Sequence, residues 1–378
     1  MQYRKFGKLD MEVSALGFGC MRLPTANDDP NNADITENEA FRLIHHAIDN
    51  GVNYFDSAYR YHSGSSEVVL GKAMKNGYRH KVQIATKAPM PMIKTAADYD
   101  RILDEQLKKL DMDYIDFYLF HGLSRNNWAL VREQDLIARA EAAQKAGKIR
   151  HIGFSFHDTF EAFEEIITGY DKWDVCQVQY NLMDENNQAG IRGLKLAASK
   201  GVGVIIMEPL RGGKLSRPVN EVTTRMEKHG YTGTLAELAF RWVWNHPEVS
   251  VVLSGMSTMA QVEENLATAD KALPGNMDED ALALVKEIEA IYRERPGIPC
   301  TACRYCMPCP QGVNIPTTLN FYNEGMIYDY YNESKRLYPL FGGNAGKCIQ
   351  CKECEEKCPQ TIPISEWMPK IKEIFEPS

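Results

Sequence analysis

Ten cysteines are spread unevenly along the 378 residues, and eight of them lie between positions 300 and 358. Clustered cysteines in a reducing compartment bind metal more often than they form disulfides. The run from Cys348 to Cys358, followed by Pro359, has the spacing C-x2-C-x2-C-x3-C-P, which is typical of thiolates that hold a 4Fe–4S cluster. A second run, from Cys300 to Cys309, has x2 spacing throughout and also precedes a proline.

Two structural zinc sites are the alternative, since zinc also takes four thiolates. Zinc knuckles usually pair two C-x2-4-C units across a spacer, whereas three tight steps followed by C-P suit a cubane cluster. Residues 300–378 resemble a dicluster ferredoxin domain of the all-helical kind. The resemblance implies two 4Fe–4S clusters, one held by Cys300, Cys303, Cys306 and Cys358 and the other by Cys309, Cys348, Cys351 and Cys354.

Three ionisable side chains, Asp56, Lys87 and His121, each close an apolar, strand-like run. Tyr61 lies in the loop after the first of these runs, and with a pKa of about 10 it needs a neighbouring cation such as Lys87 to favour its phenolate. Asp56 would hold Lys87 charged and oriented. His121 would donate a hydrogen bond to the same oxygen that Tyr61 protonates. The group suits reduction of a carbonyl, and a plain structural ion pair between Asp56 and Lys87 is the alternative.

The elements that must position these groups are eight short, β-branched runs separated by helical patterns. Eight strand–helix units over about 280 residues predict a TIM barrel, in which the chemistry sits at the carboxyl ends of the strands. A doubly wound sheet is the rival, but no G-x-G-x-x-G motif follows the first strand. Between the first two predicted strands, Thr36 and Glu39 predict a capping box at the start of a helix, and Gly51 predicts the end of the same helix. The predicted strands span residues 15–19, 53–56, 82–87, 114–121, 151–155, 175–180, 203–208 and 249–254.

The composition, with 44% hydrophobic, 25% charged and 10% aromatic residues, is that of an ordinary globular chain. The net charge of -8 argues against nucleic acid and anionic membranes as partners. No apolar run is long enough to span a membrane and no apolar signal segment follows the first residues, so we expect a cytoplasmic protein. We expect an α/β barrel over residues 1–290 and a small all-α, ferredoxin-like domain over residues 291–378, with helical periodicity at 315–337 and 364–375.

The barrel segment resembles the aldo-keto reductases over roughly residues 1–290. The match rests on residues 55–61 (FDSAYRY), 85–87 (ATK), 116–121 (DFYLFH) and 152–155 (IGFS). The resemblance implies a nicotinamide cofactor, NADP or NAD, across the barrel mouth, a small carbonyl substrate, and catalytic roles for Asp56, Tyr61, Lys87 and His121. It also implies that Ser155 and Gln177 hold the carboxamide of the cofactor, and that residues in and before the segment 208–213 contact its nicotinamide and pyrophosphate, namely Met207, Pro209, Leu210 and Gly212. The residues that match the adenosine end are Gly255, Ser257, Gln261, Glu264 and Asn265.

Some residues depart from that family. Phe156 and Met207 replace residue types that commonly contact the nicotinamide, and no Lys or Arg stands at positions 255 and 261, so NADP and NAD both stay open.

The barrel should move two electrons as hydride, whereas each cluster moves one. Three arrangements follow, in decreasing order of preference. The barrel is a conventional reductase whose clusters serve structure or docking, or a ferredoxin-like partner feeds electrons through the clusters to a flavin or substrate radical, or the barrel is a non-catalytic scaffold.

Overall fold

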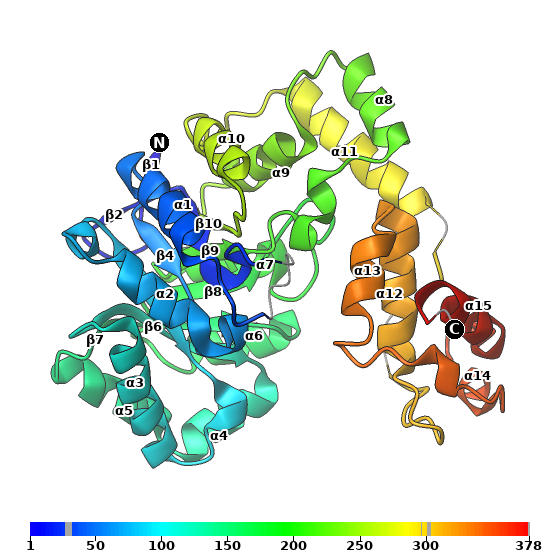
Figure 1. The fold of residues 1–378 in the computed structure, drawn as a ribbon, viewed down its shortest axis with the longest axis horizontal. Coiled ribbons are helices and arrows are strands. Elements are labelled where there is room, and N and C mark those ends of the chain that lie inside the picture. The colour runs from blue at the N-terminus through cyan, green and yellow to red at the C-terminus, as the bar shows by residue number, and fades with distance from the viewer. Residues whose placement is uncertain (27–31, 296, 301–303, 377–378) are drawn as a thin grey trace. The chain divides into compact units, whose positions relative to one another are not determined.

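The computed structural model of the chain describes residues 1–26, 32–295, 297–300 and 304–376 (Figure 1). The chain forms two compact units, each with a hydrophobic core of its own. The first unit comprises Met1–Gly213 and Gly233–Leu282, and the second comprises Lys214–Thr232 and Ala283–Ser378. The chain therefore passes from one unit to the other three times, after residues 213, 232 and 282.

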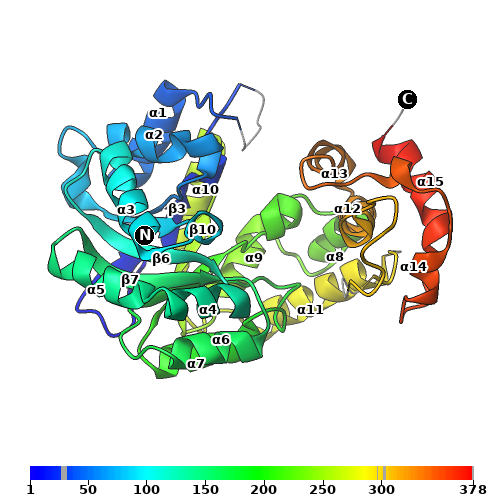
Figure 2. The ribbon, with the colours of Figure 1, turned by 90° about the horizontal axis from the view of Figure 1, so that it is seen from below.

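Eight parallel strands form a closed barrel at the centre of the first unit. This confirms the predicted TIM barrel and excludes the doubly wound sheet. The strands are buried on both faces because helices cover the outside of the barrel (Figure 2), and their sequences are accordingly apolar. Around the barrel the strands follow one another in the order β10-β3-β4-β5-β6-β7-β8-β9. Their bounds are β3 Leu16–Gly19, β4 Tyr54–Asp56, β5 Gln83–Ala88, β6 Ile115–Leu123, β7 Ile149–Phe156, β8 Val175–Gln179, β9 Gly203–Met207 and β10 Val249–Ser254.

Helices alternate with these strands and bury an apolar face on the barrel. Helix α3, for example, starts with a capping box between Thr95 and Asp98 and buries Ile102 and Leu103. The helices of the first unit are α1 Glu37–Asp49, α2 Ser65–Ala73, α3 Ala96–Leu110, α4 Arg125–Glu133, α5 Leu136–Lys145, α6 Phe160–Thr168, α7 Gly190–Ser199, α9 Leu235–Trp244 and α10 Met259–Ala269. Short 3-10 turns lie at η1 Cys20–Arg22, η2 Tyr61–Gly64, η3 Tyr78–Lys81, η4 Met90–Met92 and η5 Arg211–Ser216.

One predicted helix end differs from the structure. Helix α1 starts after Thr36, and Gly51, with a φ of 95°, follows its end as expected. The predicted capping box between Thr36 and Glu39 is wrong, because the Thr36 side chain caps no backbone N–H group. The Glu39 carboxylate instead accepts a hydrogen bond from Arg42 at 2.7 Å, so a competing partner on the same helix face takes it away from the helix end.

Aromatic packing fills the amino-terminal end of the barrel. Strands β1 (Tyr3–Lys5) and β2 (Glu12–Ser14) form an antiparallel hairpin ahead of the barrel. Phe6, between these two strands, packs on Tyr54 and Phe117, with ring centroids 5.7 and 5.1 Å away. Tyr54 begins β4 and Phe117 lies near the start of β6, so this core occupies the end opposite the carboxyl rim.

All regular structure described in the second unit is helical, which confirms the predicted all-α class. Its core includes Leu319 of α12 and Ile371 of α15. Residues 315–337, predicted to be helical, form two helices because Asp329, with a φ of 51°, ends the first of them. No helix in the described part of the chain is long and apolar enough to cross a lipid bilayer. The helices are α8 Asn220–Lys228, α11 Glu279–Glu294, α12 Ile315–Tyr328, α13 Tyr331–Leu337, α14 Glu353–Glu356 and α15 Ile364–Phe375, with a 3-10 turn η6 at Ala345–Lys347.

The segment 214–232, which follows β9 in the sequence, folds as part of the second unit. Lys214 pairs with Glu324 of α12 at 3.0 Å, and both side chains are largely buried. Arg217 pairs with Glu333 of α13 at 3.1 Å. These ion pairs tie the segment to the helices that lie next to the cysteine runs in the sequence.

Candidate active site and cluster sites

Four ionisable side chains meet at the carboxyl rim of the barrel. Asp56 ends β4, Lys87 lies near the end of β5, and His121 lies in β6. Tyr61 starts the 3-10 turn η2 after β4, and the Lys87 ammonium lies 5.0 Å from the centre of its ring. The rings of Tyr61 and His121 stand nearly perpendicular, with centroids 6.1 Å apart. The structure thus brings together all four residues that the sequence singled out for catalysis.

The ion pair of Lys87 and Asp56 is buried, with 1% and 3% of the two side chains exposed. Lys87 Nζ donates to Asp56 Oδ1 at 2.5 Å and to the backbone oxygen of Ser57 at 2.7 Å. Burial lowers the pKa of Lys87, but Asp56 and Tyr61 outweigh burial and leave this pKa above its ordinary value. Burial raises the pKa of Asp56, and the ammonium of Lys87 opposes that rise. Lys87 is therefore a cation at neutral pH.

Burial also governs the other two members of the group. It raises the pKa of Tyr61, and although Lys87 pulls that pKa down, burial is the larger effect. Tyr61 therefore keeps its proton at neutral pH. Burial, reinforced by the charge of Lys87, lowers the pKa of His121 to about 3. At neutral pH the site holds a protonated phenol, an ammonium and a neutral imidazole, which together provide a proton donor and two further hydrogen-bond donors.

Ser155 and Gln177, predicted to hold a carboxamide, lie side by side in the register of β7 and β8. Ser155 Oγ accepts a hydrogen bond from the N–H of Gly122 at 2.8 Å. Gln177 is 2% exposed, and its Oε1 has no hydrogen-bond partner within the described part of the chain. A buried acceptor without a donor is costly, so this oxygen fits an amide N–H donor such as that of a nicotinamide carboxamide.

The loop after β9 carries the next group of predicted cofactor residues. Met207 ends β9, and Pro209, Leu210 and Gly212 follow it in the sequence. Arg211, between them, pairs with Asp184 at 3.3 Å. In this conformation the guanidinium of Arg211 is therefore already balanced by an acid of the protein.

The residues predicted for the adenosine end lie around the start of α10. Gln261 Oε1 accepts a hydrogen bond from the N–H of Ser257 at 2.8 Å and helps to cap that helix. The side chains of Asn265 and Glu264 are likewise hydrogen-bonded within the barrel unit, at 3.0 and 2.6 Å. Gly255 is exposed. Most of this group is thus held in place by the protein itself.

The sequence patterns do not identify Arg22, which contacts both the loop after β9 and the residues around the start of α10. Its guanidinium donates to the backbone oxygen of Gly212 at 3.3 Å, and its own backbone oxygen accepts from Ser257 Oγ at 2.8 Å. Its side chain packs over Gly255, where an added Cβ would lie 3.1 Å from it. The signal that points to Arg22 is its place in the turn directly after β3, because residues that follow barrel strands line the carboxyl end.

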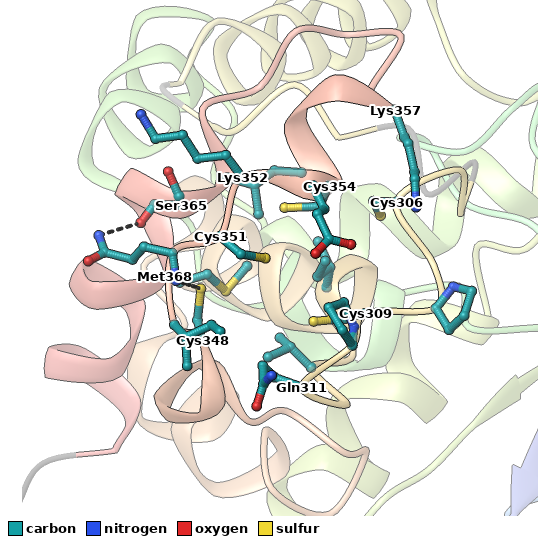
Figure 3. A pocket seen from close by; sticks show the side chains of 18 residues that line it. Cys306, Cys309, Gln311, Cys348, Cys351, Lys352, Cys354, Lys357, Ser365 and Met368 are labelled. Atoms are coloured by element: carbon teal, nitrogen blue, oxygen red, sulfur yellow. Dashed lines mark hydrogen bonds between the residues drawn. The ribbon is translucent and has the colours of Figure 1, made fainter.

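Cysteine side chains line two cavities in the second unit. Residues of both cysteine runs line each cavity, and the side chains of Cys309, Cys351 and Cys354 point toward a common space (Figure 3). Cys309 of the first run thus lies with the second run, and Cys358 of the second lies with the first. Cys303 lies outside the described residues. The first cavity is lined by Cys306, Cys309, Cys348, Cys351 and Cys354, and the second by Cys300, Cys306 and Cys358.

The arrangement of these thiols suits a cluster of several irons. Each thiolate of a 4Fe–4S cluster bonds a different iron, so the sulfurs must surround a space rather than meet at one point. Five cysteines frame the first cavity in this way. Among the described residues, no three His, Cys, Asp or Glu side chains converge closely enough for a single metal ion.

The chain belongs to the aldo/keto reductase family, whose model matches residues 15–288. The model of the 4Fe-4S dicluster domain matches residues 299–362. The two matches confirm both resemblances noted in the sequence. The protein is therefore an oxidoreductase of the aldo-keto reductase type that carries an iron–sulfur domain, and the non-catalytic scaffold is set aside.

Relatives match the chain over most of their own length. Probable aldo-keto reductase 1 of Glycine max is 29% identical over 303 residues, which cover 69% of this chain and 82% of the relative. L-galactose dehydrogenase of Arabidopsis thaliana is 29% identical over 317 residues, which cover 77% of this chain and 94% of the relative. The solved holo form of aldo-keto reductase AKR11C1 from Bacillus halodurans has a TM-score of 0.61 and 26% identity, over 76% of this chain and 96% of that chain.

Proposed function

We propose that the protein reduces a carbonyl group of a small molecule with NADPH or NADH, and that Tyr61 is the general acid. The buried pair of Lys87 and Asp56 beside a protonated Tyr61 carries this proposal. A purely structural ion pair would need neither a tyrosine nor a neutral histidine next to it. Enzymes of this family act on small carbonyl compounds, which supports the same conclusion.

Each of the four residues has a defined task in such a reduction. When bound, a nicotinamide would supply hydride to the carbonyl carbon. Tyr61 donates its phenolic proton to the carbonyl oxygen as the C=O π electrons move onto that oxygen, and an alcohol forms. Lys87 stabilises the resulting phenolate by its charge, and Asp56 holds Lys87 in place. His121, neutral because of its lowered pKa, donates an N–H hydrogen bond to the reacting oxygen, and solvent returns the proton to the phenolate.

The residues that would hold the cofactor form three groups along the rim. Ser155 and Gln177 would hold the carboxamide, because the buried Gln177 Oε1 lacks a donor. The loop after β9 would contact the middle of the cofactor, and Arg22 would face its phosphates. The full proposed set is Arg22, Ser155, Gln177, Met207, Pro209, Leu210, Gly212, Gly255, Ser257, Gln261, Glu264 and Asn265.

We assign the cysteines to two clusters, supported by the two cavities that they line. One cluster takes Cys300, Cys303, Cys306 and Cys358, and the other takes Cys309, Cys348, Cys351 and Cys354. Because such clusters supply single electrons, we propose that they stabilise the second unit and serve a ferredoxin-like partner rather than the hydride step. The exposed Cys351 would give that partner access to the second cluster. We place the protein in the cytoplasm, where clustered thiols stay reduced.

Replacing Tyr61 tests the proposed acid. Tyr61→Phe should lower kcat for NAD(P)H-linked reduction of aldehydes and ketones by about 10²–10⁴-fold. The affinity for the cofactor should stay unchanged, because the phenol acts on the substrate. Tyr59→Phe is the matched control, since Tyr59 lies in the same loop but donates to Glu105 at 2.8 Å. Wild-type turnover in Tyr61→Phe would remove Tyr61 from this role.

An anaerobic titration tests the role of the clusters. Purified, iron-replete protein is titrated with NADPH and then NADH while the nicotinamide absorbance and the cluster bands are followed. The proposal expects cofactor binding with unchanged clusters. Bleaching of the clusters without an added flavin or partner would instead show one electron path through both units and favour the partner-fed alternative.

A further inference from the structure

A second polar cluster is buried behind the catalytic rim, where the barrel packs against α2 and α3. It consists of Glu67, Thr86, Gln106 and Tyr118, each at most 2% exposed. Polar side chains are rarely buried this deeply unless they are hydrogen-bonded, and each of these four is. None of them has a task in the mechanism above.

Gln106 of α3 reaches the backbone of the catalytic lysine. Its Nε2 donates to the backbone oxygen of Lys87 at 3.1 Å and to Glu67 Oε1 at 2.5 Å. At the other end of the amide, Oε1 accepts a hydrogen bond from the hydroxyl of Tyr118 at 2.7 Å. The amide is thus fixed from both sides, and one of its donors holds β5 at the position of Lys87.

Glu67 of α2 fixes the same stretch of β5 through a side chain. Its Oε1 accepts a hydrogen bond from Thr86 Oγ1 at 2.6 Å, and Thr86 directly precedes Lys87. The Lys109 ammonium lies 3.5 Å from the other oxygen of Glu67 and compensates its charge. One carboxylate oxygen therefore orients both Gln106 and Thr86.

Ser66, which directly precedes Glu67, acts through Ser57 on the ammonium end of Lys87. Lys87 Nζ donates to the backbone oxygen of Ser57, whose hydroxyl lies 2.9 Å from that of Ser66. Ser66 Oγ in turn donates to the backbone oxygen of Cys20 at 2.9 Å, so the Ser57 hydroxyl must donate to Ser66. The first turn of α2 thereby holds both ends of Lys87.

We propose that Glu67 and Gln106 are positioning residues for the reaction: they fix the backbone of Lys87 so that its ammonium stays on Asp56 and beside Tyr61. This inference rests on the proposed function. A lysine has a long, flexible stem, so a shift of its backbone moves the charged end. A misplacement of about 1 Å costs roughly 10²-fold in rate.

The test is Gln106→Met, which keeps the size of the side chain and removes its hydrogen bonds. Asp116→Asn is the matched control, because buried Asp116 accepts from the N–H of Ile84 at 2.9 Å and so holds the other end of β5. For both variants we would measure the cofactor Kd, the single-turnover rate of hydride transfer, its solvent isotope effect and the thermal midpoint. Crystal structures would give the distance from Lys87 Nζ to Asp56 Oδ1.

In Gln106→Met we expect hydride transfer to slow by about 10–100-fold with an unchanged cofactor Kd and a larger solvent isotope effect. The distance from Lys87 Nζ to Asp56 Oδ1 should exceed hydrogen-bond length. Asp116→Asn should lower the thermal midpoint and leave both the rate and that distance unchanged. Equal rate losses in the two variants, or an unmoved Lys87 in Gln106→Met, would overturn the proposal.

Two further results keep the test decisive. If Gln106→Met does not fold, Tyr118→Phe removes only the hydrogen bond to Gln106 Oε1, and the same changes are expected at smaller size. If the wild type transfers no hydride to any carbonyl compound, the proposed function fails. The crystal structures still decide whether Gln106 positions Lys87, because the distance does not depend on turnover.

Discussion

The catalytic rim of the barrel and the cysteine cavities of the second unit are built in opposite ways. At the rim, the charges of Lys87 and Asp56 balance each other, and the strand ladder places them without help from a ligand. In the second unit, cysteines from distant parts of the sequence surround cavities, and Cys351 is exposed. The rim should therefore form in the protein alone, whereas the second unit should depend on its metal for much of its folding energy.

The largest effect should come from removing one cluster ligand. Cys354→Ala should lose about half of the bound iron and make the second unit sensitive to protease, because metal binding and folding are coupled there. Cys176→Ala is the matched control, since Cys176 is buried in β8 of the barrel and should keep all the iron. Iron analysis and limited proteolysis measure both. Full iron content in Cys354→Ala would contradict the cavity assignment.

The next largest effect should come from breaking the ion pair of Lys87 and Asp56 at the rim. Lys87→Met leaves the buried Asp56 without its cation and should destabilise the barrel by about 3–5 kcal/mol. The double variant Lys87→Met with Asp56→Asn should regain most of this stability in denaturant unfolding, yet remain inactive. A single Lys87→Met variant as stable as wild type would show that the pair does not hold the rim together.

A smaller effect is expected at the cofactor loop. Arg22→Met should weaken binding of NADPH or NADH by about 10- to 150-fold, because hydrogen bonds to charged groups contribute roughly 1.5–3 kcal/mol. Fluorescence titration gives the Kd. Arg42→Met, which changes an exposed arginine of α1, should leave the Kd unchanged. Equal Kd values for wild type and Arg22→Met would remove Arg22 from the cofactor site.

The smallest effect is a dependence on pH. His121 has a pKa of about 3 in the folded protein and about 6.5 when unfolded, so it binds a proton more readily unfolded. It therefore contributes stability above about pH 6.5 that is lost as the pH falls toward 3. His121→Asn should lose less stability than wild type over this range in thermal melts.

Since His121 stays neutral and Tyr61 protonated, kcat should be flat between about pH 5 and 9.

Much of the barrel could be predicted from the sequence because its strands are buried on both faces. In such strands an ionisable residue stands out, and this is how Asp56, Lys87 and His121 become visible. The TIM barrel follows from the same eight apolar runs. Local signals are less secure where a second partner competes, as Arg42 competes for Glu39 at the start of α1.

Other features depend on contacts that the sequence does not display. Gln106 sits in an ordinary helical pattern, and its partners Glu67 and Lys87 come from elements brought near only by the barrel. Spacing alone places Cys309 and Cys358 in separate runs, whereas the resemblance to dicluster ferredoxin domains implies that each joins the other run, and in the folded chain each lines a cavity with cysteines of that other run. Sequence spacing reports neighbours along one element, but not those across elements.

The three passages of the chain between its units limit how this protein can be divided. A gene fragment that ends near residue 290 would keep Lys214 and Arg217 but lose Glu324 and Glu333, their buried or half-buried partners. A fragment that begins there would lack the whole segment 214–232. No single cut yields either unit complete, so the two units must be kept on one chain when the protein is expressed or engineered.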